Sequence, residues 1–179
     1  VPDQSGRVFF ITGANSGLGF ETAKILAGKG ARVLLGGRSE DKAAAAMAAI
    51  QADHPEADLR FIPLDLGDLE STRNASKMVD AEARLDVLVN NAGIMMPPRE
   101  ETRDGFESQL GVNQLGPFAI TGLLLNQLSQ GQNARIVLTP SMAHGGGRPD
   151  FYEPNADETP SPVGGYGAGN LAILLRRYE

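Results

Sequence analysis

A run of glycines near the amino terminus has the spacing of a loop that binds phosphate. The segment Thr12-Gly13-Ala14-Asn15-Ser16-Gly17-Leu18-Gly19 lies between a short apolar run and a stretch of helical period. The first glycine would permit a tight turn, the second would let the backbone approach a pyrophosphate, and the third would let the helix pack closely on the strand. The N–H groups and positive dipole end of that helix would face the anion. The residues expected to bind a nucleotide are Gly13, Asn15, Ser16, Gly17, Leu18 and Gly19. The alternative is a turn without a ligand, because glycine is common between strand and helix.

A second chemical signal lies about twenty residues further on, where NAD-binding domains carry an acidic residue for the ribose hydroxyls. This chain has Gly36-Gly37-Arg38 at that place. A guanidinium can pair bidentately with a 2′-phosphate, which a carboxylate would repel. Arg38 therefore favours NADP over NAD, and the alternative is an arginine that is simply solvated.

The elements that must position these residues follow from short apolar runs that alternate with stretches of helical period. The runs lie at 7–12, 32–35, 59–64, 87–89 and 135–139. Nearly continuous apolar runs of this kind predict strands of a parallel sheet covered by helices on both faces. Five alternations of strand and helix indicate a doubly wound α/β domain with right-handed crossovers.

The predicted helices have their own signals. Ser39 and Asp68 are placed to begin the second and third helices, and Met47 and Ile50 to face inward on the second. Leu18, Thr22, Ile25 and Leu26 share one face of the first helix. A longer helix after the fourth run is expected to bury Phe106, Leu110, Thr121, Leu124 and Leu128.

Residues 140–165 form a connection of 26 residues with five glycines and five prolines. So long a segment without secondary structure is usually functional in a compact domain, so we expect an active-site loop. A tolerated insertion is the alternative.

Composition limits the other classes of function. The net charge of −6 argues against sequence-independent binding to nucleic acid or to an anionic membrane. With no cysteine, and with only His54 and His144, the chain has no thiolate or histidine pair at metal-ligand spacing. No stretch approaches the ~20 apolar residues of a membrane span. The length of 179 residues predicts one domain, and we expect a cytoplasmic protein.

With these residues in hand, the chain resembles the short-chain dehydrogenase/reductase family, most closely its retinol-dehydrogenase-like, NADP-preferring branch. The further landmarks are Leu64-Asp65-Leu66, Asn90-Asn91-Ala92-Gly93, Asn113, Ser141 and Tyr166, in family-like order. The resemblance implies a Rossmann-type doubly wound sheet with strand order 3-2-1-4-5 and NADP as the cofactor. The family's two later strands are not expected within these 179 residues.

The resemblance also implies roles for these residues. Asp65 and Leu66 would border the adenine, and Asn91, Ala92 and Gly93 would line the cofactor and support the central strand. Tyr166 would be the general acid/base, Ser141 would orient the substrate oxygen, and the main chain of Asn113 would hold a water in the proton relay. A phenol and a hydroxyl suit these tasks because each can donate and accept a hydrogen bond.

Three features depart from the family pattern. Asn170 stands where the family has a lysine four residues after the tyrosine, so ribose binding can survive but easy deprotonation of Tyr166 is not expected. Pro117 lacks an N–H for the carbonyl of Asn113, which predicts a kink in the long helix. The fifth strand would be an apolar edge, which a second copy could cover in a homo-oligomer.

These expectations favour an oxidoreductase that transfers a hydride between NADP(H) and a carbonyl or secondary alcohol. The alternative, motivated by Asn170, is a protein of the same fold that binds or senses NADP without catalysis.

Overall fold

A five-stranded parallel sheet forms the centre of the computed structural model, which describes residues 1–131 and 133–140. The strands are β1 (Val8–Thr12), β2 (Arg32–Gly37), β3 (Asp58–Pro63), β4 (Val87–Asn90) and β5 (Arg135–Leu138), in the order β3-β2-β1-β4-β5. This confirms the predicted Rossmann-type order. The order reverses between β1 and β4, and in open sheets of this kind ligands bind at the carboxyl ends of the strands beside that reversal.

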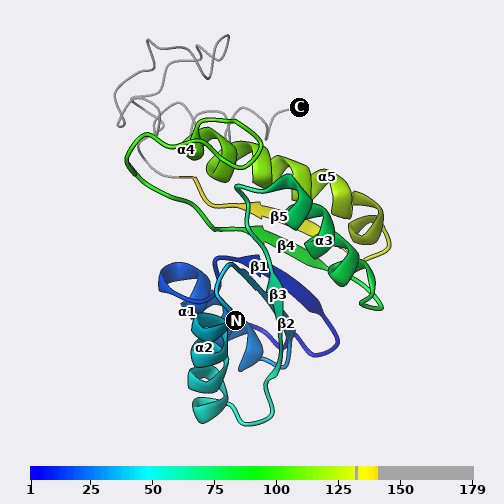
Figure 1. The fold of residues 1–179 in the computed structure, drawn as a ribbon. Helices are drawn as coiled ribbons and strands as arrows, with labels where there is room; N and C mark the ends of the chain where they lie inside the picture. The colour runs from blue at the N-terminus through cyan, green and yellow to red at the C-terminus, as the bar shows by residue number, and fades with distance from the viewer. Residues whose placement is uncertain (132, 141–179) are drawn as a thin grey trace.

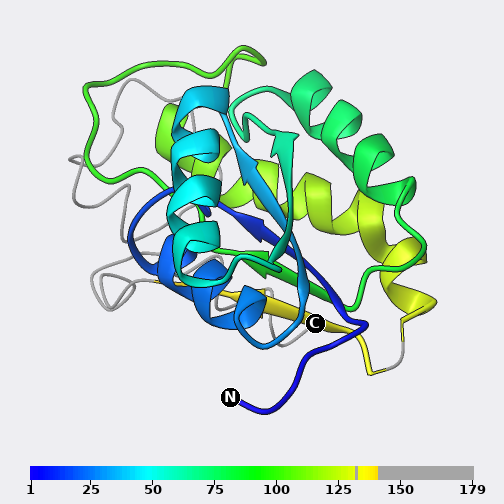
Figure 2. The ribbon, with the colours of Figure 1, turned by 90° about the horizontal axis from the view of Figure 1, so that it is seen from below.

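Helices cover both faces of the sheet (Figures 1 and 2). Helices α1 (Gly17–Ala27) and α2 (Glu40–Asp53) lie on one face, and α3 (Leu69–Asp80) and α5 (Gly116–Ser129) lie on the other. Successive side chains of each strand enter opposite cores: Phe10 and Leu34 pack with α3 and α5, whereas Phe9 and Val33 pack with α1 and α2. Strands β1 and β4 are buried along their whole length, and β2 is buried except at its two ends, because helices cover both faces of the sheet there.

The expected face of α1 was wrong for Leu18 and Ile25, although Leu26 packs against the core as expected. Leu18 and Ile25 are 72% and 49% exposed, whereas Ala23 is fully buried. The reason is the close approach of this helix to β1, since a Cβ at Gly19 would lie 2.3 Å from the carbonyl oxygen of Gly13. Only the small residues Gly19, Ala23 and Ala27, spaced by four, can face the sheet at that distance.

The predicted starts of α2 and α3 are confirmed by their caps. The Ser39 hydroxyl accepts a hydrogen bond from the Lys42 N–H, and the Asp68 carboxylate accepts from the N–H groups of Glu70 and Ser71. On α2, Ile50 is fully buried and Met47 packs against the same core, as expected.

The long helix after β4 is not uniform. It begins with α4 (Ser108–Leu110), passes through the π-helical turn η1 (Gly111–Leu115) and continues as α5. Phe106 precedes the helix instead of lying on it, while Leu124 and Leu128 are buried as expected. The irregularity falls directly before Pro117, because a proline cannot donate to the carbonyl four residues earlier.

Strand β5 is an exposed edge within the described part of the chain, with Ile136 and Val137 each more than 40% exposed. The predicted loop at 140–165, except for Pro140, and the helix expected after it lie outside the described residues. Within residues 1–131 and 133–140, no helix is long and apolar enough to cross a membrane.

Candidate functional site

The glycine loop adopts the conformation that its spacing predicted. Gly13 and Gly17 have φ angles of +69° and +55°, which residues with a Cβ rarely adopt. A Cβ at Gly13 would lie 3.0 Å from the Cα of Ala92, so the turn is packed against the loop after β4. A Cβ at Gly17 would meet no atom of the described residues within 4 Å, which leaves space for a ligand beside the backbone there.

The first turn of α1 begins at this loop. Ser16 occupies the N-cap position and makes no side-chain cap hydrogen bond, unlike Ser39 and Asp68 at the next two helices. The first N–H groups of an α-helix have no partner within the helix, and they stabilise an anion placed at its end. The start of α1 is therefore suited to a pyrophosphate.

Thr12 and Asn91 tie the glycine loop to the end of β4. The Thr12 hydroxyl accepts hydrogen bonds from the N–H groups of Asn91 and Ala92, both at 3.0 Å. The Asn91 amide nitrogen donates to the carbonyl of Thr12 at 3.0 Å and to that of Gly13 at 3.5 Å. The expected support of the central strand by Asn91 is thus visible as a brace between two strand ends.

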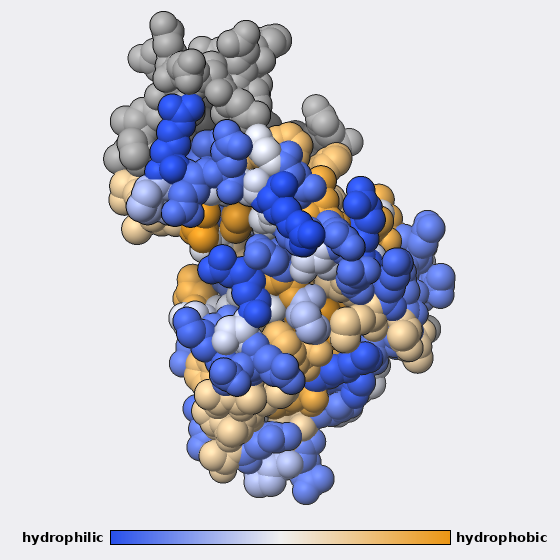
Figure 3. Space-filling model, viewed as in Figure 1, coloured by the Kyte–Doolittle hydropathy of each residue, from blue (hydrophilic) through white to orange (hydrophobic). Residues whose placement is uncertain are grey.

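A cavity of about 360 Å³ lies at the carboxyl ends of β1 to β4. The surface is hollowed between the part over α1 and α2 and the part over α4 (Figure 3). Nine of the residues expected to bind the cofactor line the cavity: Gly13, Asn15, Ser16, Arg38, Asp65, Leu66, Asn91, Ala92 and Gly93. These come from four separate segments, so the fold assembles one site from residues up to 80 positions apart in the chain.

The remaining expected residues are placed differently. Gly19 is buried against the carbonyl of Gly13, and Gly17 and Leu18 continue from the loop into α1 without lining this cavity. Ser141, Tyr166 and Asn170 lie outside the described residues, so their catalytic roles stay predictions.

Asn113 is 5% exposed and supports the cavity wall from behind. Its side-chain oxygen accepts from the N–H of Ile94, and its amide nitrogen donates to the Ile94 carbonyl, both at 2.8 Å. Asn113 lies on the π-helical turn η1, where the N–H of Gly116 bonds to the carbonyl of Gly111. This side chain therefore fixes the loop after β4 to the helix, a role that the sequence did not indicate.

Sequence reasoning missed several lining residues: Gly36, Gly37, Lys42, Leu64, Ile94 and Val112. Lys42 is the important omission because it adds a second cation beside Arg38. Both side chains are exposed, and neither forms an ion pair within the described part of the chain. The sequence did carry a signal for Lys42. The helix dipole disfavours a positive charge in the first turn of a helix, so a lysine in the first turn of α2 is unexpected unless it contacts an anion.

Asp65, after β3, is the acidic residue among the described residues that line the cavity. One oxygen of the Asp65 carboxylate accepts from the N–H of Gly67 at 2.9 Å, and the Asp65 N–H donates to the Ser71 hydroxyl. The Leu66 side chain belongs to the core beneath α3 and α5, so Leu66 offers mainly its backbone to the cavity. No group of three or more metal-ligating side chains occurs among the residues that the structure describes.

Comparison with known proteins places this geometry in a family. The family model for short chain dehydrogenases matches residues 7–152. Retinol dehydrogenase 12 of Mus musculus is 42% identical over 171 residues, which are 95% of this chain and 54% of that protein. Polyprenol dehydrogenase of Mus musculus is 39% identical over 180 residues, with 98% and 54% covered. The chain thus spans about half the length of these curated relatives.

Solved structures agree with this assignment. A crystal structure of an uncharacterized protein from Mycobacterium paratuberculosis matches with a TM-score of 0.82 and 40% identity over 98% of this chain and 61% of that one. An alcohol dehydrogenase from the archaeon Thermococcus sibiricus, complexed with 5-hydroxy-NADP, matches with a TM-score of 0.74 and 26% identity over 96% and 69%. The chain belongs to the short-chain dehydrogenase/reductase family and is retinol-dehydrogenase-like.

Proposed function

We propose that the chain binds NADP(H) in this cavity and acts as an oxidoreductase that interconverts a carbonyl compound and a secondary alcohol. The observation that carries the proposal is the pair of cations that line the cavity, Arg38 directly after β2 and Lys42 in the first turn of α2. Two cations that form no ion pair with any described residue suit a 2′-phosphate, and a guanidinium can contact it through two parallel hydrogen bonds. The complex of the related alcohol dehydrogenase with 5-hydroxy-NADP supports the same cofactor.

The residues present fit such a cofactor along the whole cavity. Gly17 leaves open space beside the start of α1 for the pyrophosphate, and Asp65 has a carboxylate oxygen available for the amino group of adenine. NADPH, when bound, supplies the hydride. The loop after β4, held by Asn113, would form the wall at the far end of the site.

Proton transfer is the task of the chain's own hydroxyl groups in this proposal. Tyr166 passes a proton to or from the substrate oxygen, and Ser141 orients that oxygen by a hydrogen bond. The names of the two curated relatives refer to primary alcohols, retinol and polyprenol, so they support a carbonyl/alcohol pair in general and make aldehydes as well as ketones the compounds to test.

The cofactor proposal is tested by reversing the charge at Arg38. A charge-assisted contact in a partly exposed site contributes about 1.5–3 kcal/mol, so Arg38→Asp should weaken NADPH binding at least tenfold and leave NADH binding unchanged. Fluorescence titration of both cofactors measures this. Arg73→Asp, at an exposed position of α3, is the matched control and should change neither affinity. Equal NADPH affinity in Arg38→Asp and the parent would refute the proposed phosphate contact.

A second candidate function, NADP binding without catalysis, is favoured by Asn170 at the place of the family lysine. Oxidation of NADPH with a panel of ketones and aldehydes separates the two. Turnover that is lost in Tyr166→Phe supports the oxidoreductase. Asn170→Lys adds a charge that would lower the pKa of Tyr166, so it should raise the rate of alcohol oxidation more than that of carbonyl reduction. Tight NADPH binding with no turnover in any of these proteins would support the second candidate.

A further inference from the structure

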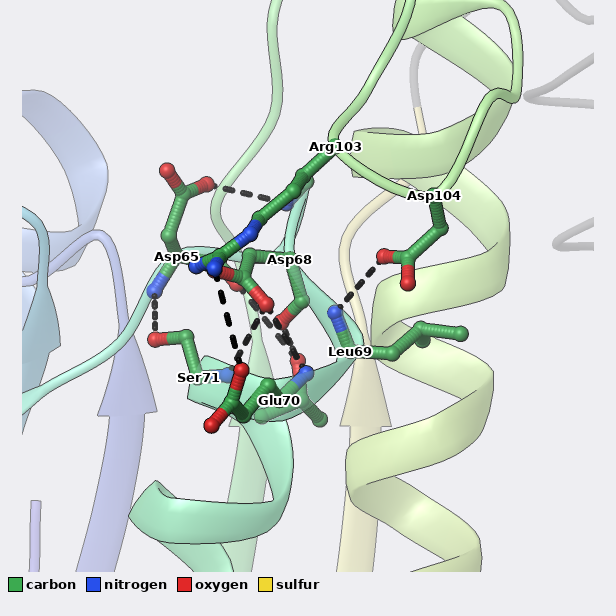
Figure 4. A network of polar contacts seen from close by, with 9 residues as sticks. Asp65, Asp68, Leu69, Glu70, Ser71, Arg103 and Asp104 are labelled. Carbon is green, nitrogen blue, oxygen red and sulfur yellow. Dashed lines mark hydrogen bonds and ion pairs between the residues drawn. The ribbon is translucent and has the colours of Figure 1, made fainter.

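A short loop lies against the turn that carries Asp65, although it is distant from that turn in sequence. The loop runs from Thr102 to Phe106, and the turn joins β3 to α3 (Figure 4). It is a compact unit: the N–H of Thr102 donates to the carbonyl of Phe106 at 2.7 Å, and the N–H of Phe106 donates to the Thr102 hydroxyl at 3.1 Å. Gly105, with φ of +80°, closes it. Its shape is thus set by its own hydrogen bonds.

The loop is also anchored on the π-helical turn η1. The Thr102 methyl group lies 2.3 Å from where a Cβ of Gly111 would be, so it fills a notch that only glycine leaves. The same methyl group lies 3.7 Å from the corresponding point at Gly67. Thr102 therefore stands between the helix and the turn that follows β3.

Asp104 and Arg103 form hydrogen bonds with residues at the start of α3. A carboxylate oxygen of Asp104 accepts from the N–H of Leu69 at 2.8 Å, and Asp68 accepts from the next two N–H groups of the helix. The second oxygen of Asp68 accepts from the Arg103 guanidinium at 2.8 Å. Figure 4 shows Arg103 reaching across Asp68 towards Glu70, with Asp104 directed at Leu69. The first N–H groups of α3 are thus bonded to carboxylates from two segments.

Gly67 connects the loop to Asp65 by two hydrogen bonds. The N–H of Arg103 donates to the carbonyl of Gly67 at 3.1 Å, and the N–H of Gly67 donates to the Asp65 carboxylate at 2.9 Å. Ser71, in the first turn of α3, accepts from the N–H of Asp65 at 2.9 Å. Both the backbone and the carboxylate of Asp65 are therefore oriented by groups that the loop holds in place.

We infer that the loop 102–106 positions Asp65 for the adenine end of the cofactor, with Asp104 and Arg103 as positioning residues. This inference rests on the proposed function, in which the Asp65 carboxylate accepts a hydrogen bond from the adenine amino group. A carboxylate already held in its binding orientation loses less rotational freedom when the cofactor binds. Removing the contacts of the loop with the start of α3 should weaken the hydrogen bond between Asp65 and the adenine amino group about two- to tenfold. The exposed ion pair of Arg103 should contribute less than the Asp104 bond to the helix.

The test compares NADPH with its deaminated analogue, in which hypoxanthine replaces adenine and the amino group is absent. The dissociation constant of the analogue divided by that of NADPH reports the contact to Asp65, and this ratio is insensitive to a general loss of affinity. The parent should prefer NADPH, and Asp65→Ala should remove the preference. Asp104→Ala should lower the ratio about two- to tenfold. Asp104→Asn should retain the parent ratio, because an amide oxygen still accepts from the Leu69 N–H.

Matched controls lie on the same helix. Asp80→Ala and Arg73→Ala change exposed residues of α3 and should leave the ratio at the parent value. Thermal unfolding of each variant identifies any that fails to fold. If Asp104→Ala does not fold, Arg103→Ala replaces it, and its ratio should fall below that of Asp104→Asn. A purely structural role for the loop would weaken both cofactors equally in Asp104→Ala and leave the ratio unchanged, which would overturn the inference. A parent that binds NADPH but shows no preference for adenine would overturn it too. A parent that binds neither cofactor would refute the proposed function itself.

Discussion

Replacing Asn113 by alanine gives the sharpest test of how the cavity wall is held. The side chain makes two hydrogen bonds of 2.8 Å to the backbone of Ile94, and it is 5% exposed. Alanine would leave the N–H and the carbonyl of Ile94 without these partners. An unsatisfied buried polar group costs about 1–3 kcal/mol. Because Ile94 is only partly buried, we expect Asn113→Ala to lower the free energy of unfolding by about 2–4 kcal/mol.

Urea denaturation followed by circular dichroism measures this loss. For a chain of this size, 1 kcal/mol corresponds to about 2–4 °C, so the melting temperature should fall by about 5–15 °C. Asn126→Ala is the control, because Asn126 is an exposed residue of α5, and its free energy of unfolding should stay within about 0.5 kcal/mol of the parent. If the two variants unfold alike, the bonds to Ile94 do not hold this loop and the argument fails.

Four further substitutions test packing and charge. Gly116→Ala should destabilise the protein by about 1–3 kcal/mol and weaken NADPH binding, because its Cβ would lie 2.4 Å from the Leu66 carbonyl oxygen at the cavity wall. Gly122 lies on the same helix with no described atom within 4 Å of its Cβ position, so Gly122→Ala should instead raise the free energy of unfolding by up to about 1 kcal/mol. Chemical denaturation of the two variants measures both changes. Gly13→Ala should reduce both stability and cofactor affinity, since φ is +69° there; unchanged NADPH titration would contradict it. The guanidinium groups of Arg32 and Arg60 lower the pKa of Glu82 below its ordinary value near 4.5. The stability from ionised Glu82 is therefore full above about pH 4.5 and lost as the pH falls through the lowered value. Glu82→Gln should be less stable than the parent at neutral pH, and the difference should shrink as the pH falls below about 4.5.

The sequence alone predicted the fold and the conformation of the glycine loop. Apolar runs in alternation with helical stretches predicted the parallel sheet, because strands buried on both faces have no polar face. The glycine loop and Arg38 could be interpreted locally, since turn geometry and charge depend on a few adjacent residues. Ser39 and Asp68 marked their helices for the same reason, as a cap acts on N–H groups two or three positions away.

Only the tertiary structure decided which side chains meet across the chain. The buried face of α1 was mistaken because the distance between helix and strand, and not hydrophobicity, selects Gly19 and Ala23. Asn113 meets Ile94 only when η1 packs on the loop after β4. Asp104 reaches the N–H of Leu69 across 35 positions of sequence, a contact that no local pattern encodes. Such contacts depend on the path of the backbone in space, so they follow from the packing of whole elements and not from the spacing of residues.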